Sequence, residues 1–165
     1  MNVLVSKERK ALLKAIQATY GCSSIFSDFV LFKTSKEEKL WIAPKEIFNV
    51  NVEKLRPQSA GLYIGRIDRG VLRLSIEGAQ IVGKTATKGI VEIDKEQLWD
   101  FLRGFDINIF KKVEVQDNSY VLVRYGTDVL GVSKLVGDKL QNVLPKSRKL
   151  ISLTKEKDLY EEEAK

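Results

Sequence analysis

The sequence predicts an α+β fold, built as two small units that each combine helices with several short strands. Apolar residues recur with helical spacing in residues 6–20 and again in residues 98–105, and short apolar runs bounded by turn residues accompany each of them. A polar stretch, residues 84–88, separates the two halves. A chain of 165 residues is long enough for one domain, or for two small ones that share an interface.

The first half is predicted to contain two helices and four strands. In residues 6–20, Leu12, Ala15 and Ile16 lie on one helical face, and Gly21 stands where a helix commonly ends. Ser75 can cap a second, short helix that ends at Gly83. The apolar runs between turn residues predict strands at 29–32, 40–43, 62–67 and 71–74.

The second half is predicted to contain one helix and a prominent hairpin. Asp94 and Gln97 have the spacing of a capping box, and apolar side chains at 98, 101, 102 and 105 form the core face of the helix that follows. Residues 126–128 turn a strand at 120–125 back into a strand at 129–135. Further short elements are expected at 90–93, 113–115, 140–144 and 149–153.

These elements suggest three segments along the chain. An N-terminal α/β domain is expected over residues 1–84 and a second domain over residues 85–154. Residues 155–165 are almost all charged and are expected to form a tail or a frayed helix.

The composition favours a polyanion partner without demanding one. Lys and Arg number 28 against 22 acidic residues, a net charge of +6, which suits nucleic acid and equally suits solubility. One Cys and no apolar run of about 20 residues fit a reducing compartment and no membrane span. The first residues lack the order of a signal peptide. A cytoplasmic location is therefore expected.

The residues that most catalytic sites require are missing. The sequence has no His, no phosphate-binding loop and no dinucleotide-binding glycine turn, so histidine-dependent nucleophiles and the common histidine metal sites are excluded. Cys22 could be a nucleophile, but a half-buried structural thiol is the simpler interpretation. We expect no enzyme activity, no cofactor and no metal, although a site made only of carboxylates stays open.

The basic segment, residues 134–149, is the best candidate for a nucleic-acid contact. It holds five cations against one acid, Asp138, and it follows the clearest hairpin. Such cations can neutralise phosphates, and an arginine can also stack on an unpaired base. A solvated surface is the alternative, just as Tyr120, Tyr125 and Phe105 could stack on bases or lie in the core. The candidate RNA-binding residues are Lys134, Lys139, Lys146, Arg148 and Lys149, with Arg124 in support.

The second half also resembles a known family. Phe101–Gly104, Tyr120–Tyr125, Asp128–Lys134 and Gln141–Arg148 are similar to the PUA-like RNA-binding domain, as found at the C-terminus of Sun-family RNA cytosine-5 methyltransferases. There, a strand with a glycine leads to an Asn-x-x-Pro-Lys ending. The resemblance spans about residues 86–153 and implies a mixed β-barrel, or pseudo-barrel, whose basic residues at and after the last hairpin contact RNA.

The layout of the whole chain is similar to Nip-type ribosome-biogenesis factors, which pair an α/β domain with a C-terminal PUA-like domain. The residues that carry this likeness are Tyr20–Gly21, Ser59–Gly65 and Arg73–Leu74. The methyltransferase machinery is not found, because there is no cofactor-binding glycine loop and Cys22 follows Gly rather than Pro.

The sequence therefore predicts a non-catalytic RNA-binding adaptor in rRNA or ribosome maturation, or in tRNA or rRNA modification. Its expected partners are rRNA or tRNA, with ribosome-assembly or methyltransferase proteins as further candidates. A protein–protein scaffold subunit of such a complex is the alternative.

Overall fold

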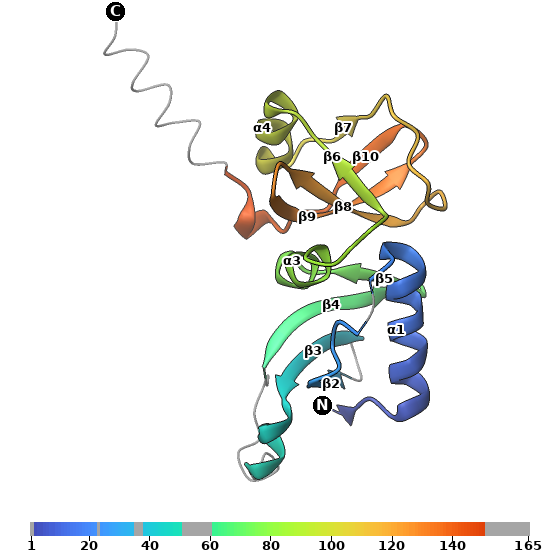
Figure 1. Ribbon diagram of the computed structural model, residues 1–165. Coiled ribbons are helices and arrows are strands. Elements are labelled where there is room, and N and C mark those ends of the chain that lie inside the picture. Colours follow the sequence, from blue (N-terminus) through green and yellow to red (C-terminus); the bar gives the residue numbers. More distant parts are fainter. Residues whose placement is uncertain (1, 23, 35–37, 51–60, 151–165) are drawn as a thin grey trace, which may run out of the picture.

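The structure, a computed structural model, describes residues 2–22, 24–34, 38–50 and 61–150. It contains two five-stranded sheets, one above the other, with a short helix between them (Figure 1). This arrangement confirms the predicted α+β class. The charged tail expected at residues 155–165 lies outside the described residues.

The first sheet is antiparallel throughout, and its strands follow the order of the chain. A long helix, α1, packs on it, and a 3-10 turn follows the third strand (Figure 1). The elements are β1 (Asn2–Val3), α1 (Ser6–Tyr20), β2 (Phe29–Lys33), β3 (Lys39–Pro44), η1 (Lys45–Asn49), β4 (Leu62–Asp68) and β5 (Val71–Leu74).

Helix α1 forms where its apolar spacing predicts it. Leu12, Ile16 and Tyr20 are buried along one side, which is the spacing of neighbours on a helical face. Gly21 ends the helix in the left-handed conformation, with φ of 70°, and its N–H donates to the carbonyl of Gln17. A glycine adopts this conformation without the steric cost that a Cβ would bring.

The second sheet is mixed and curls into a half-barrel. Strand β6 runs parallel to β8, and the other pairs are antiparallel, in the order β6-β8-β9-β10-β7. The predicted capping box is present, since Asp94 accepts from the N–H of Gln97 at 2.9 Å. The elements are β6 (Ile90–Glu92), α4 (Lys95–Arg103), β7 (Ile107–Asn108), β8 (Tyr120–Tyr125), β9 (Asp128–Val136), β10 (Lys139–Asn142) and η2 (Lys146–Arg148).

One predicted strand, residues 113–115, is wrong. Residues 113–115 are irregular, although they alternate apolar and polar side chains, and Val115 donates only to the nearby carbonyl of Val113. Of the strand expected at 149–153, only residues 149 and 150 are described, and neither is in a strand; residues 151–153 lie outside the described residues. A strand needs a partner with free backbone groups, and periodicity cannot supply one. The short strand β7 (Ile107–Asn108) was missed.

Helix α3 (Ile76–Gly83) joins the two sheets. It packs against β4 on one side and β9 on the other (Figure 1). The main core cluster accordingly contains Ile64 from the first sheet, Val82 from α3, and Leu122 and Val132 from the second sheet. A smaller cluster lies inside the half-barrel, around the fully buried Phe101. The domain boundary between residues 84 and 85 stays a prediction.

Gly78 allows α3 to approach β4 closely. A Cβ at Gly78 would lie 2.1 Å from the carbonyl oxygen of Ile64, a backbone atom that cannot swing aside. We expect Gly78→Ala to lower the free energy of unfolding by about 1–3 kcal/mol through overpacking, although alanine is ordinarily the better helix former. Denaturant unfolding measures this, with Gln80→Ala on the exposed side of α3 as control. A stabilised Gly78→Ala variant would contradict the close approach.

Candidate nucleic-acid interface

The basic segment is anchored by Asn142. Its side-chain amide donates to the carbonyls of Phe101, at 2.8 Å, and Phe105, at 3.2 Å. These acceptors lie at and just beyond the end of α4, where carbonyls lack partners within the helix. The N–H of Asn142 donates to Asp106, and its side-chain oxygen accepts from Leu144. Asn142 thereby ties the last strand to α4.

The three cations that follow Pro145 lie on one short turn. Pro145 begins the 3-10 helix η2, which contains Lys146 and Arg148. Both side chains are exposed, and Arg148 forms an ion pair with Glu77 of α3 at 2.6 Å. Lys149 is half-buried because its aliphatic stem passes close to Gly104 at the end of α4. The turn brings these three predicted residues together.

The other predicted cations are more scattered. Lys134 on β9 and Lys139 on β10 belong to one hairpin, where Lys134 faces Gln141 across the ladder. Lys134 is half-buried, and Lys139 lies 3.8 Å from Asp106, at the limit of an ion pair.

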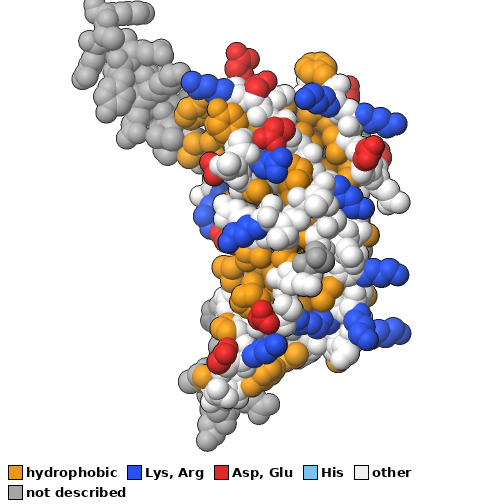
Figure 2. Space-filling view, in the orientation of Figure 1, with side chains coloured by type: hydrophobic (Ala, Val, Ile, Leu, Met, Phe, Trp, Pro, Cys, Tyr) orange, Lys and Arg blue, Asp and Glu red, His pale blue; other side chains and the backbone are white. Residues whose placement is uncertain are grey.

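Arg124 is placed in a different environment. Its guanidinium donates to Glu92 on the neighbouring strand β6 at 2.8 Å. It lines a hollow of about 740 Å³ together with Lys111 and Lys112, and Arg148 does not line this hollow. On the face of the molecule that Figure 2 shows, Lys and Arg side chains are spread over both halves, with acids among them. Charge alone therefore does not locate one site.

The predicted aromatic residues divide between core and surface. Tyr120 is buried, Tyr125 is half-buried and Phe105 is 58% exposed. Two more aromatic side chains, Trp99 and Phe110, are 44% and 97% exposed, and Phe110 directly precedes Lys111.

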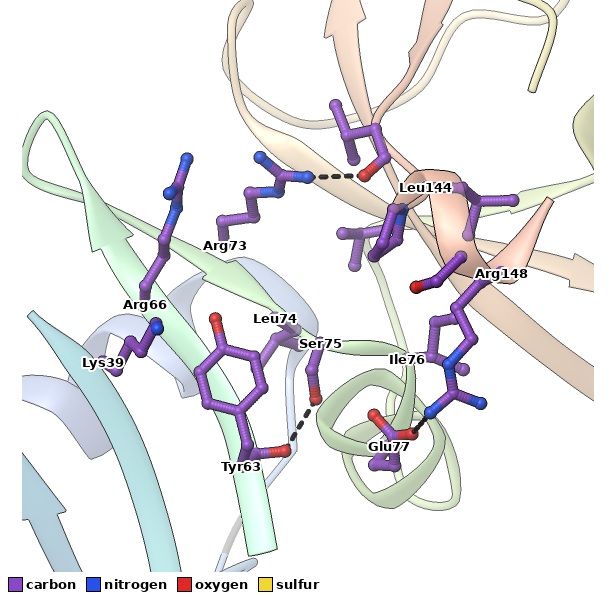
Figure 3. Close-up of a pocket in the computed structure, with 14 residues that line it drawn as sticks. Lys39, Tyr63, Arg66, Arg73, Leu74, Ser75, Ile76, Glu77, Leu144 and Arg148 are labelled. Atoms are coloured by element: carbon purple, nitrogen blue, oxygen red, sulfur yellow. Dashed lines mark hydrogen bonds and ion pairs between the residues drawn. The ribbon is translucent and has the colours of Figure 1, made fainter. Parts of the chain in front are cut away.

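A cleft of about 310 Å³ lies between the two halves (Figure 3). Strands β3 to β5 and the start of α3 form one wall, and β9 with the basic segment forms the other. Four of its lining residues are cations and one is an acid, which leaves a net charge of +3. These charged residues are Lys39, Arg66, Arg73, Arg148 and Glu77.

Two hydrogen-bonded arginines cross this cleft. The guanidinium of Arg73 donates to the carbonyl of Val143, and Arg148 pairs with Glu77. Each contact joins the first half of the chain to the basic segment (Figure 3). Hydrogen bonds that involve a charged group contribute more than neutral ones, so these two contacts help to hold the walls in place.

The cations of the first sheet were not among the predicted site residues. Arg66 and Arg73 are cross-strand partners in the β4–β5 hairpin. The signal was available, because a hairpin that pairs Asp68 with Val71 also pairs residues 66 and 73. Like charges directly opposite each other on a sheet are unfavourable, which marks such a pair for attention. The contribution of Lys39 had no such local signal.

A chain of hydroxyl hydrogen bonds joins the halves beside the cleft. The hydroxyl of Tyr20 donates to the backbone carbonyl of Tyr120 at 2.9 Å, and the hydroxyl of Tyr120 donates to Asp68 at 2.8 Å. This hydrogen bond, with help from the nearby arginines 66, 69 and 73, lowers the pKa of Asp68. Burial, together with the Asp68 carboxylate, raises the pKa of Tyr120.

Cys22 is buried, more fully than the half-buried thiol that was predicted. Burial raises the pKa of its thiol, which disfavours the thiolate that a nucleophile requires. Among the described residues, no three His, Cys, Asp or Glu side chains gather as metal ligands would. None of the helices in the described ranges is long and apolar enough to cross a membrane.

Comparison with known families identifies the second half of the chain. Residues 88–150 match the family described as the methyltransferase RsmF PUA domain. This part of the chain is a PUA domain of the RsmF methyltransferase type, which confirms the PUA-like resemblance.

The particular relatives are bacterial proteins named ribosomal RNA small subunit methyltransferase F. Those of Aeromonas salmonicida and Aeromonas hydrophila are 29% and 30% identical over 143 residues, which cover 87% of this chain. That of Shewanella oneidensis is 30% identical over 111 residues, 67% of this chain. The chain spans only 28%, 28% and 23% of these relatives' lengths. An alignment of 143 residues extends well beyond the PUA match, so the first half shares in the likeness.

The bridge between Tyr120 and Asp68 predicts a dependence of stability on pH. Because the pKa of Asp68 is lowered by folding, its contribution is complete above the unfolded value of about 3.9 and is lost as pH falls through the folded value. Asp68→Asn should therefore lower the free energy of unfolding most at neutral pH, and the difference from wild type should shrink below about pH 4.

Denaturant unfolding at several pH values tests this difference. The control is Asp28→Asn, because Asp28 is exposed and takes no part in the bridge. A difference between wild type and Asp68→Asn that stays constant from neutral pH to pH 3 would show that the carboxylate charge does not stabilise the bridge.

Proposed function

We propose that this chain binds RNA through its PUA domain and acts in the modification of ribosomal RNA. The match of residues 88–150 to the methyltransferase RsmF PUA domain carries this proposal. The name of these relatives supports ribosomal RNA as the class of substrate to which the domain is directed. In this proposal, the chain contributes binding and positioning, and the chemical step belongs to a catalytic domain.

Several cations of the second half have positions that suit this function. Lys146, Arg148 and Lys149 lie on an anchored turn beside the cleft. Contacts to phosphates give affinity without sequence preference, and each one releases counterions from the RNA. Binding should therefore weaken steeply as salt concentration rises. Lys134, Lys139 and Arg124 remain candidates for weaker contacts along the same domain.

The basic turn can be tested by removing its three charges together. The triple variant Lys146→Ala, Arg148→Ala, Lys149→Ala should bind a structured ribosomal RNA fragment about tenfold or more weakly. The slope of log affinity against log salt should fall by about 2 for three lost phosphate contacts. Fluorescence anisotropy titrations at four or five salt concentrations measure both quantities.

A matched control removes three exposed cations from helix α1, through Lys7→Ala, Lys10→Ala and Lys14→Ala. This variant has the same net charge as the first but keeps the basic turn. Thermal unfolding checks that both variants fold. If both lose affinity and slope equally, general charge holds the RNA and the turn does not. If neither variant changes affinity or slope, the assignment of the basic turn is wrong.

A second candidate is docking to a protein of the same modification machinery. It is favoured by the exposed aromatic side chains Trp99, Phe105 and Phe110, since exposed aromatic groups are enriched at protein interfaces. An association that survives nuclease treatment and is lost in a Trp99→Ala, Phe110→Ala variant would favour this candidate over RNA binding.

A further inference from the structure

We propose that the cleft between the two sheets binds one unpaired nucleotide of the RNA. Its phosphate would lie against a row of cations formed by Lys39, Arg66 and Arg73, and its base beside Tyr63. This inference rests on the proposed function and adds residues of the first half of the chain, which lie outside the PUA match, to the RNA-binding surface.

The three cations stand in register across three adjacent strands. Lys39 on β3 pairs with Arg66 on β4, and Arg66 pairs in turn with Arg73 on β5. Directly opposed side chains lie on the same face of a sheet, where like charges repel. All three line the cleft, and Figure 3 shows Arg66 and Arg73 rising side by side from the hairpin. A bound anion would relieve this repulsion.

The contacts of Arg66 and Arg73 account for only part of the charge of these two residues. Glu77, the acid in the cleft wall, is already paired with Arg148. Arg73 gives one N–H to Val143, and a guanidinium has five such donors. Within the described part of the chain, Arg66 has no hydrogen bond or ion pair, and its side chain is exposed. Arg66 is therefore the residue whose position the fold itself does not explain.

The nearby carboxylate offsets the charge of the row only in part. Asp68 carries one negative charge against three cations, and the charges of Arg66 and Arg73 help to lower its pKa. One of its oxygens also accepts the hydroxyl of Tyr120. The start of α3 adds further positive potential, because Ser75 and Ile76 line the cleft at the N-terminus of the helix. The N-terminus of α3 thus adds to the positive potential of the cleft.

The size and walls of the cleft select the kind of nucleotide. A volume of about 310 Å³ lies at the lower end of small-molecule sites, so one nucleotide fits and a duplex does not. The wall opposite the row of Lys39, Arg66 and Arg73 is largely apolar. Its apolar residues are Val132, Val143, Leu144 and Pro145. Tyr63 is held by ring contact with Trp41, with centroids 5.3 Å apart. An unpaired base can use such aromatic and apolar surfaces.

The decisive variant is Arg66→Gln, because Arg66 lines the cleft and makes no hydrogen bond or ion pair within the described part of the chain. Arg69→Gln is the matched control, since Arg69 is exposed in the turn of the same hairpin and does not line the cleft. The probe is a single-stranded oligoribonucleotide of eight residues, compared with a duplex of the same sequence. Arg66→Gln should weaken single-strand binding about threefold to tenfold and lower the salt slope by about 0.7, one phosphate's share.

Two further variants separate charge from stacking. Arg66→Lys keeps the charge and should restore most of the salt slope. Tyr63→Leu should weaken single-strand binding while leaving the slope unchanged, because it removes stacking and no charge. Thermal unfolding verifies that each variant is folded, and Arg69→Gln should stay within twofold of wild type.

The outcomes separate this inference from the proposed function. If Arg66→Gln and Arg69→Gln bind alike while the basic-turn variant is weakened, the cleft does not hold RNA and the proposed function stands. If duplex and single strand bind equally and Tyr63→Leu has no effect, the cleft does not take an unpaired nucleotide. If wild type shows no salt-dependent RNA binding at all, both proposals fail.

Discussion

The close packing of α3 between the two sheets is the constraint on which the rest of the structure depends. Gly78 lets the helix touch the carbonyl of Ile64 on β4, and Gly83 lets its other end lie against Val129 on β9. Neither sheet therefore buries its apolar side alone. Tyr20 and Leu122, which come from opposite halves of the chain, lie in one core cluster, so burial of apolar area stabilises both halves together.

This shared core also creates the cleft. Because α3 spaces the sheets apart, the first sheet and the basic segment face each other across a gap that side chains only partly fill. Arg73, Arg148 and the hydroxyl chain through Tyr120 cross between the halves around that gap. Polar groups that hold two surfaces at a set distance can prepare a binding site before any ligand arrives.

The similarity to known proteins reflects both the two halves of the chain and the core that they share. The PUA match covers residues 88–150, where the half-barrel and the Asn142-anchored ending lie. The longer alignments cover 87% of the chain, which is understandable if the first half evolved as a partner in a common core. In an RNA-binding role, both halves of the chain are candidates for the contact, because charged residues from each half line the cleft.

The sequence by itself determined the α+β class, the PUA-like ending, most elements and their local signals. Gly21 and the Asp94–Gln97 capping box act over a few residues, so spacing alone predicts them. The strand predicted at residues 113–115 is wrong because a strand depends on a partner that spacing does not reveal. The cation row was decided only by tertiary structure. Lys39 meets Arg66 across strands 27 positions apart in sequence, next to a register shift at Leu40 and Trp41, and no local rule fixes such a pairing.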